Sequence, residues 1–269
     1  VIVIFQMSNR TFSISLVLVA LALPLSYASA GTVNSKLNVS FMGIGVAQMK
    51  NSYAIDGSRY SVSGSVKTNP LISIVSSTKA SFRSNGVMNG SSLLPTQHEL
   101  TFSQRRKKGR LALLFANGNV TKQEVLPKKR FKKGQVPLVP AHLKAVLDPV
   151  SALIFPVTQA KVGDGNSVCN RTVPVYDGNN RLNLKFSYKA SRTVRAKGFN
   201  GPAFVCSVRY QPIAGHRPER KNTKFMVANR DMEVTMARLG NSNAYGLFAF
   251  RVKTRRGVAK GVATAFHQN

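Results

Sequence analysis

Apolar and polar side chains alternate along most of this chain, and this period-two pattern limits the fold more than any other feature. In residues 58–68, for example, Tyr60, Val62 and Val66 fall on one face. An Asp-Gly pair at residues 56–57 precedes that run, and such a pair between alternating segments is a strong hairpin signal. The pattern therefore predicts a protein built mainly of antiparallel β-strands.

Similar runs and turn signals continue to the end of the chain. Asn117-Gly118 and Asp177-Gly178 each separate two alternating segments. The predicted strands cover residues 37–55, 58–68, 71–84, 98–104, 111–115, 120–126, 173–176, 181–190, 192–197, 203–211, 223–228, 231–238, 245–254 and 258–266. Many strands with closely spaced turns favour a mainly β fold, either a large curved antiparallel sheet or a half-open β-barrel. Such a sheet must curl to bury its apolar face, and its concave side is then either a packed core or a ligand cavity.

One segment breaks the alternation. Apolar positions in residues 137–156 follow helical spacing, which predicts one or two short helices near residues 140–156. Pro149 is suited to the first turn of the second helix. Asp148 precedes it, where a carboxylate can accept a hydrogen bond from a first-turn amide. We therefore expect Asp148 to cap a helix rather than to act in catalysis.

Residues 7–30 show the order of parts found in secretory signal peptides. Arg10 supplies a positive charge, residues 14–23 form an apolar run, and Ala28-Ser29-Ala30 places small side chains at the cleavage point. The apolar run is shorter than the roughly 20 residues that a membrane-spanning helix needs. A cleaved leader is therefore predicted, with an uncleaved membrane anchor as the alternative.

The leader divides the chain into two parts. Residues 1–30 comprise upstream residues and the cleaved signal peptide, and residues 31–269 form one β-rich domain of the cell envelope. Within that domain the helical segment joins strand groups 37–126 and 173–266. Because the leader directs export, the periplasm is the predicted location.

The chain has two cysteines, Cys169 and Cys206. In an oxidising compartment a single pair favours a disulfide. It would close a loop of about 38 residues and contribute about 3–4 kcal/mol in the chain-entropy description. The alternative is two buried free thiols. The cysteines and the four histidines show no metal-ligand spacing, so neither a metal nor a cofactor is predicted.

The charge is strongly positive, with 39 Lys and Arg against nine Asp and Glu and a net charge of +30. Such a chain needs anionic partners. Outside the cytoplasm these are anionic lipid, lipopolysaccharide or a wall polymer rather than nucleic acid, and peripheral contact with a membrane is expected. Two basic runs are the candidate anion-binding residues: Arg105, Arg106, Lys107 and Lys108, which resemble a hairpin tip, and Lys128, Lys129, Arg130, Lys132 and Lys133. The alternative is that both runs are merely solvated loops.

Several short motifs occur together in an informative order. They are Gly57-Ser58-Arg59-Tyr60, Ser81-Phe82-Arg83-Ser84, Asp148-Pro149-Val150-Ser151-Ala152-Leu153, Pro174-Val175-Tyr176-Asp177-Gly178 and Lys197-Gly198-Phe199. Over roughly residues 40–265 the chain thereby resembles a bacterial family of exported proteins, the domain of unknown function numbered 3108. The resemblance implies a β-rich envelope protein without an established enzymatic activity. The motif residues Asp148, Pro149, Ser151, Tyr176, Asp177 and Gly178 are expected to be structural.

The sequence lacks the motifs of the common hydrolases. Gly-x-Ser-x-Gly and His-Glu-x-x-His are both absent, and the few acidic residues form no carboxylate couple. We therefore expect a non-catalytic envelope protein that binds lipid or an anionic polymer and contributes to envelope structure. The alternative is a hydrolase or other enzyme acting on envelope polymers, which predicts that residues such as His142, Asp148 and His216 converge in one cleft.

Overall fold

The structure is a computed structural model, and it describes residues 31–69, 78–104, 107–128 and 130–268. The predicted signal peptide and residues 71–77 of one predicted strand lie outside the described residues. The strands are β1 (Gly31–Phe41), β2 (Ile44–Asp56), β3 (Arg59–Thr68), β4 (Thr78–Asn89), β5 (Ser92–Gln104), β6 (Lys107–Ala116), β7 (Asn119–Leu126), β8 (Phe155–Pro156), β9 (Arg171–Tyr176), β10 (Arg181–Ala196), β11 (Phe199–Ala214), β12 (Met232–Arg238), β13 (Ala244–Thr254) and β14 (Gly257–Gln268).

These strands form one antiparallel sheet whose edges are not paired with each other. The strand order is β7-β6-β5-β4-β3-β2-β1-β14-β13-β12-β11-β10-β9, with β8 paired beside β13. The first and last strands of the chain therefore meet in the middle of the sheet, and β7 and β9 are its edges. The mainly β, curved antiparallel fold predicted from the alternation is confirmed.

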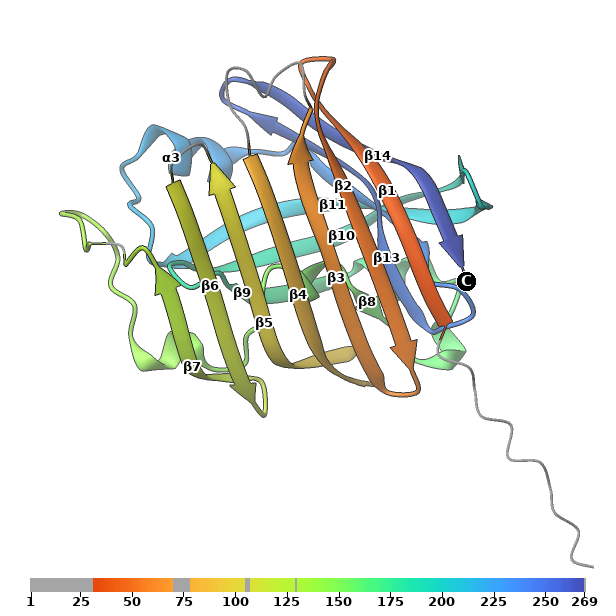
Figure 1. The fold of residues 1–269 in the computed structure, drawn as a ribbon, viewed down its shortest axis with the longest axis horizontal. Helices are drawn as coiled ribbons and strands as arrows, with labels where there is room; N and C mark the ends of the chain where they lie inside the picture. The colour runs from red at the N-terminus through yellow and green to blue at the C-terminus, as the bar shows by residue number, and fades with distance from the viewer. Residues whose placement is uncertain (1–30, 70–77, 105–106, 129, 269) are drawn as a thin grey trace, which may run out of the picture.

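The sheet curls so that its two halves face each other. In Figure 1 strands β1 to β7 form a front layer, and β9 to β11 run across behind it. Inward side chains from both layers share one core, which includes Leu37 and Val62 from the front and Phe186 and Val208 from the back. Most of the concave side is thus packed core, because side chains of the two layers meet across it.

Two internal glycines allow close contacts within the sheet, and one of them lies at a bulge. A Cβ at Gly86 would lie 2.4 Å from the carbonyl oxygen of Leu94, and the pairing of β4 with β5 shifts register at this point. Such a bulge increases the local bend of a strand. At Gly64 a Cβ would lie 2.5 Å from Cζ of Phe82, whose strand β4 pairs with β3. Both glycines therefore leave room for a close contact that a larger residue would obstruct.

The segment between the two strand groups contains short 3₁₀ helices. They are η1 (Pro140–Leu143), η2 (Ser151–Leu153) and η3 (Gln159–Lys161), followed by the helix α2 (Gly165–Cys169). The first two lie where one or two short helices were predicted. In the described residues no helix is both long and apolar enough to cross a membrane.

Three sequence predictions about elements need correction. Residues 223–228, predicted as a strand, belong to the helix α3 (Lys221–Ala228). Their apolar run is too short for periodicity to separate strand from helix. The predicted strand 37–55 is a hairpin that turns at Met42-Gly43, where both residues have positive φ. Residues 181–190 and 192–197 are one strand, β10, with a register shift between Tyr188 and Ala190.

Candidate functional site

An apolar groove remains open beside the core on the concave side. It has a volume of about 340 Å³, and its lining includes Met49, Leu184, Tyr210, Met226, Met232 and Phe250. Leu184 and Tyr210 are paired neighbours on β10 and β11, so both side chains point to the same face of the sheet. Met226 comes from α3, which borders the groove. The groove matches the size and apolar character of small-ligand sites.

The lining of the groove is unusually rich in flexible side chains. Three methionines contribute to it, from β2, α3 and β12. Methionine is unbranched and polarisable, so a methionine-rich surface can adapt to apolar ligands of different shape. Leu184, Met226 and Phe250 are only partly buried although they pack against the core. The groove is thus an accessible extension of the core.

A basic hollow adjoins the groove. We call it the basin, and it has a volume of about 720 Å³. Its cationic lining residues are Arg130, Lys132, Arg217 and Arg220, and Asp177 is its one carboxylate. Burial, and to a smaller degree the charge of Asp177, raise the pKa of Tyr210, a residue that lines both basin and groove.

Backbone hydrogen bonds bring the two walls of the basin together. The amide of Val136 donates to the carbonyl of His216 at 2.8 Å, and the amide of Gly215 donates to the carbonyl of Val136 at 2.9 Å. The side-chain amide of Gln135 adds a bond to the carbonyl of Gly215 at 2.8 Å. Because of this docking, Arg130 and Lys132 lie beside a turn more than eighty residues later in the chain.

The two predicted basic runs end up in different places. Arg130 and Lys132 line the basin, and Lys128 and Arg130 line a neighbouring hollow. Lys108, at the start of β6, lines a separate shallow hollow with Lys67 and Lys79. Exposed Lys107 and Lys133 line none of these hollows in the described structure, and Arg105, Arg106 and Lys129 lie outside the described residues. The strands on either side of Arg105 and Arg106 do pair as a hairpin, Gln104 opposite Lys107.

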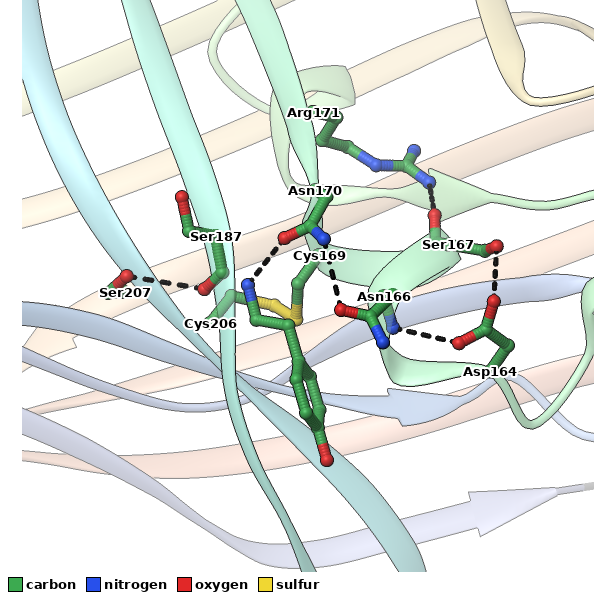
Figure 2. The surroundings of a disulfide bond; sticks show 10 residues. Asp164, Asn166, Ser167, Cys169, Asn170, Arg171, Ser187, Cys206 and Ser207 are labelled. Atoms are coloured by element: carbon green, nitrogen blue, oxygen red, sulfur yellow. Dashed lines mark hydrogen bonds between the residues drawn. A yellow bond between two sulfur atoms is a disulfide. The ribbon is translucent and has the colours of Figure 1, made fainter.

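The predicted disulfide is confirmed. Cys169 at the end of α2 is bonded to Cys206 on β11, with the two Cα atoms 5.3 Å apart (Figure 2). Beside it, Oδ1 of Asn170 accepts a 2.7 Å hydrogen bond from the backbone amide of Tyr188. Arg171 donates to the carbonyl of Ser167 at 2.8 Å, and burial lowers the pKa of this arginine to about 10. The disulfide and these bonds attach α2 to the back layer of the sheet.

Asp148 accepts a bond from the first amide of η2, as predicted, but the N-cap residue of that helix is Val150. Its Oδ1 accepts hydrogen bonds from the amides of Val150 at 2.9 Å and Ser151 at 3.0 Å. The same oxygen accepts a 2.8 Å bond from the hydroxyl of Ser84 and lies 3.1 Å from Nδ1 of His98. Pro149, predicted in the first turn of the helix, instead precedes its N-cap residue Val150. Burial pushes the pKa of Asp148 up, but the bonds and charge from His98 and the bonds from Ser151 outweigh burial and lower it.

Ser84, His98 and Asp148 include the residue types of a hydrolytic triad but not its arrangement. Ser84 and Asp148 both approach Nδ1 of His98, whereas a triad uses one ring nitrogen for each partner. Each side chain is at most 1 % exposed. Nearby, the hydroxyls of Tyr60 and Ser151 share a 2.8 Å hydrogen bond, which continues the buried polar network. The cluster fastens η2 to the front layer.

The three residues named by the enzyme alternative have separate surroundings. Nδ1 of His142 in η1 accepts a 3.2 Å bond from the amide of the N-cap residue Val139. Asp148 is buried in the cluster just described, and His216 lines the basin. Within the described residues no group of three His, Cys, Asp or Glu side chains is arranged to hold a metal ion.

The motif Tyr176-Asp177-Gly178 forms the turn between β9 and β10. Oδ1 of Asp177 accepts bonds from the amides of Asn179 at 2.9 Å and Asn180 at 2.7 Å. Gly178 has a φ of 84°, a backbone conformation that residues other than glycine rarely adopt. This agrees with the predicted hairpin chemistry.

Sequence reasoning did not identify the groove, the Arg217 and Arg220 wall of the basin, or the partners of Asp148. Apolar alternation in β10 to β13 shows which side chains face inward. The same alternation is expected whether the inward side is filled or leaves a groove. Ser84 and His98 are separated from Asp148 by 64 and 50 positions, and only the curl of the sheet brings them together.

Comparisons with known proteins give a family and a fold relative. A comparison with curated protein sequences found no match. Among solved structures, one that resembles this fold is a β-barrel-like protein of the domain of unknown function DUF1849 from Brucella abortus, with a TM-score of 0.48 and 8% identity over 89% of this chain and 98% of that chain. The sequence profile of the family described as protein of unknown function (DUF3108) matches residues 36–264. Because that match covers most of its length, the chain belongs to this family, DUF3108.

Proposed function

We propose that this protein is an exported, non-catalytic component of the bacterial cell envelope that holds the hydrocarbon chain of an anionic amphiphile in its apolar groove. The observation that carries this proposal is the groove itself, because it keeps apolar lining accessible at the edge of a packed core. Covering apolar surface of this kind with a ligand is favourable, at roughly 25 cal/mol for each Å² removed from water.

The positive charge beside the groove favours an amphiphile with a negatively charged head group. The whole chain carries a net charge of +30, and the basin beside the groove has four cations against one carboxylate. A neutral hydrocarbon would use the groove alone, whereas an anionic amphiphile would use both surfaces. Clefts lined by charge of one sign concentrate ions of the opposite sign.

The proposed location outside the cytoplasm rests on two features. Residues 7–30 have the organisation of a signal peptide. The disulfide between Cys169 and Cys206 is typical of proteins in oxidising compartments. In Gram-negative bacteria both features would place the protein in the periplasm.

Peripheral contact with a membrane is supported by an apolar tip close to the groove. Met42 and Ile44, in and after the β1–β2 turn, are 63% and 64% exposed. The amide of Met42 bonds to the carbonyl of Val258, which places exposed Arg255 and Arg256 in the adjoining turn. Arg255 in turn donates a 3.1 Å bond to Asn222 of α3. Apolar tips with neighbouring cations suit anionic membrane surfaces.

The test of the groove compares two adjacent positions on α3. Met226 lines the groove, whereas Val227 does not and is 44% exposed. A charge placed in an apolar site is costly to desolvate, so Met226→Glu should weaken binding of the uncharged fluorescent probe N-phenyl-1-naphthylamine by about tenfold or more. Val227→Glu, the matched control, should leave binding unchanged.

A second measurement concerns the native ligand. The protein extracted from envelope material should carry bound lipid that native mass spectrometry detects, and the Met226→Glu protein should carry much less. A wild-type protein that binds neither the probe nor any lipid contradicts the proposal. Equal binding by wild type and Met226→Glu contradicts it as well.

A further inference from the structure

The basin and the groove form one continuous surface. On β10, Leu182 lines the basin and Leu184, two residues along on the same face of the strand, lines the groove. On α3, Thr223 lines the basin and Met226, one turn later, lines the groove. Tyr210 on β11 lines both. A ligand that leaves the groove at this end therefore enters the basin directly.

Among the described residues, the cations of the basin have no carboxylate partner in an ion pair. In the part of the chain that the structure describes, none of Arg130, Lys132, Arg217 and Arg220 forms an ion pair. The one acidic side chain of the basin, Asp177, already accepts bonds from the amides of its own turn. Hydrogen bonds between the two walls thus hold four cations around a hollow that one carboxylate, Asp177, lines.

The start of α3 adds to the positive potential. The helix begins at Lys221, its N-cap residue is Arg220, and no side chain caps it. Arg220 and Thr223, on either side of that first turn, both line the basin. Uncapped first-turn amides and the helix dipole favour an anion at this end. This contribution is secondary to that of the four side chains.

We propose that the basin binds the phosphate group of the amphiphile whose hydrocarbon chain lies in the groove. This inference rests on the proposed function of the groove and names its ligand as a phosphorylated lipid or a related alkyl phosphate. Three of the four cations are arginines, whose planar forks bind phosphate oxygens in pairs. A phosphate monoester offers three oxygens and close to two charges at neutral pH, whereas a carboxylate offers two oxygens and one charge.

The experiment uses three probes that separate head from tail. They are decyl phosphate, which has both parts, decanol, which has only the tail, and inorganic phosphate, which has only the head. Binding of each to the purified protein is measured by calorimetry below micellar concentrations. In the wild type, decyl phosphate should bind about tenfold or more tightly than decanol, because charge-assisted hydrogen bonds are added to the same tail contacts.

The variants remove charge at matched places. Arg217→Gln combined with Arg220→Gln should weaken decyl phosphate binding by about tenfold and leave decanol binding unchanged. Lys107→Gln combined with Lys108→Gln removes the same charge from exposed positions that do not line the basin, and should change neither affinity by more than about twofold. Circular dichroism and thermal melting establish that both double variants remain folded.

Each outcome separates the two proposals. If the Arg217 and Arg220 variant binds decyl phosphate like the wild type while Met226→Glu does not bind it, the head-group site is wrong and the groove stands. If that variant loses decanol and decyl phosphate equally, the head-group site is also wrong. If inorganic phosphate binds the wild type but not the variant, and decanol binds neither, the basin is a phosphate site and the proposed lipid function is wrong.

Discussion

The hydroxyl of Tyr176 donates a 2.6 Å hydrogen bond to Oε1 of Gln123, and this bond joins the two edges of the sheet. Tyr176 is the last residue of the edge strand β9, and Gln123 lies in the opposite edge strand β7. The ring of Tyr176 also belongs to a small core cluster with Leu111 and Leu113 of β6. Side chains thus join the two edge strands directly, and backbone bonds of Val146 and Leu147 also link the β6–β7 turn to β9.

Tyr176→Phe should lower the free energy of unfolding by about 1 kcal/mol, the usual net value of one hydrogen bond. The midpoint of thermal unfolding should fall by about 2–4 °C. Tyr188→Phe is the control, because no hydrogen bond of the Tyr188 hydroxyl occurs among the described residues. Equal shifts in the two variants would show that the bond across the seam contributes nothing.

Asp148→Asn should destabilise the protein by about 2–3 kcal/mol at neutral pH, because a buried charge-assisted network loses the charge of its acceptor. The pKa of Asp148 is lower in the folded protein than its ordinary value, so its stabilising contribution is present above pH 4. As the pH falls through the folded pKa, the carboxylate takes up a proton and that contribution is lost. Urea unfolding from pH 7 to pH 2.5 should therefore show the two proteins converging in stability. A constant gap across this range would contradict the role assigned to Asp148.

Much of the fold is predictable because its rules are local. Alternating side chains define most strands, and Asp56-Gly57, Asn117-Gly118 and Asp177-Gly178 all lie at hairpin turns. The turn at Met42-Gly43 was missed, because Met42 adopts a positive φ that its side chain gives no reason to expect. The segment that forms α3 was wrongly predicted as a strand. Its apolar run is too short for periodicity to decide, so its helical form depends on tertiary packing.

The site is harder to predict because it depends on how far the sheet curls. The sequence shows that Leu184 and Tyr210 face inward, but not that the opposite layer leaves them partly uncovered. Arg130 and Arg217 become neighbours only through the backbone bonds of Val136 and Gly215. Cys169 and Cys206 were predictable for a different reason, since two cysteines allow one intramolecular pairing.

Loss of the disulfide between Cys169 and Cys206 should lower the stability of the folded protein. The bond joins residues 37 positions apart, so replacing Cys169 and Cys206 with alanine should lower the free energy of unfolding by about 3–4 kcal/mol. Chemical denaturation measures this difference. Dithiothreitol should destabilise the wild type and have no effect on the double variant. A thiol assay of the unfolded, unreduced protein should detect no free thiol, and two reactive thiols in the purified protein would contradict the pairing.

Gly178→Ala should be more harmful than Gly134→Ala. Both glycines have positive φ, 84° and 73°, so both substitutions cost about 1–2 kcal/mol in the backbone. A Cβ at Gly178 would also lie 2.4 Å from Cδ1 of Leu111, whereas one at Gly134 would meet open space. Overpacking adds about 1–3 kcal/mol at Gly178 alone. Thermal melting of the two variants measures the difference, and equal melting points would mean that Leu111 moves aside without cost.

The exposed tip should direct the groove toward a membrane. Met42→Ser combined with Ile44→Ser removes two apolar side chains beside Arg255 and Arg256, each worth up to about 1.5–3 kcal/mol if fully inserted. Cosedimentation with phosphatidylglycerol vesicles should therefore fall by about tenfold or more. The control pair is Leu114→Ser with Val262→Ser, which are 42% and 50% exposed on β6 and β14. Because neighbouring arginines contribute, raising the salt concentration should weaken wild-type binding too. If the control pair reduced binding as much as the tip variant, contact would depend on general surface apolarity, and the tip would have no special part in it.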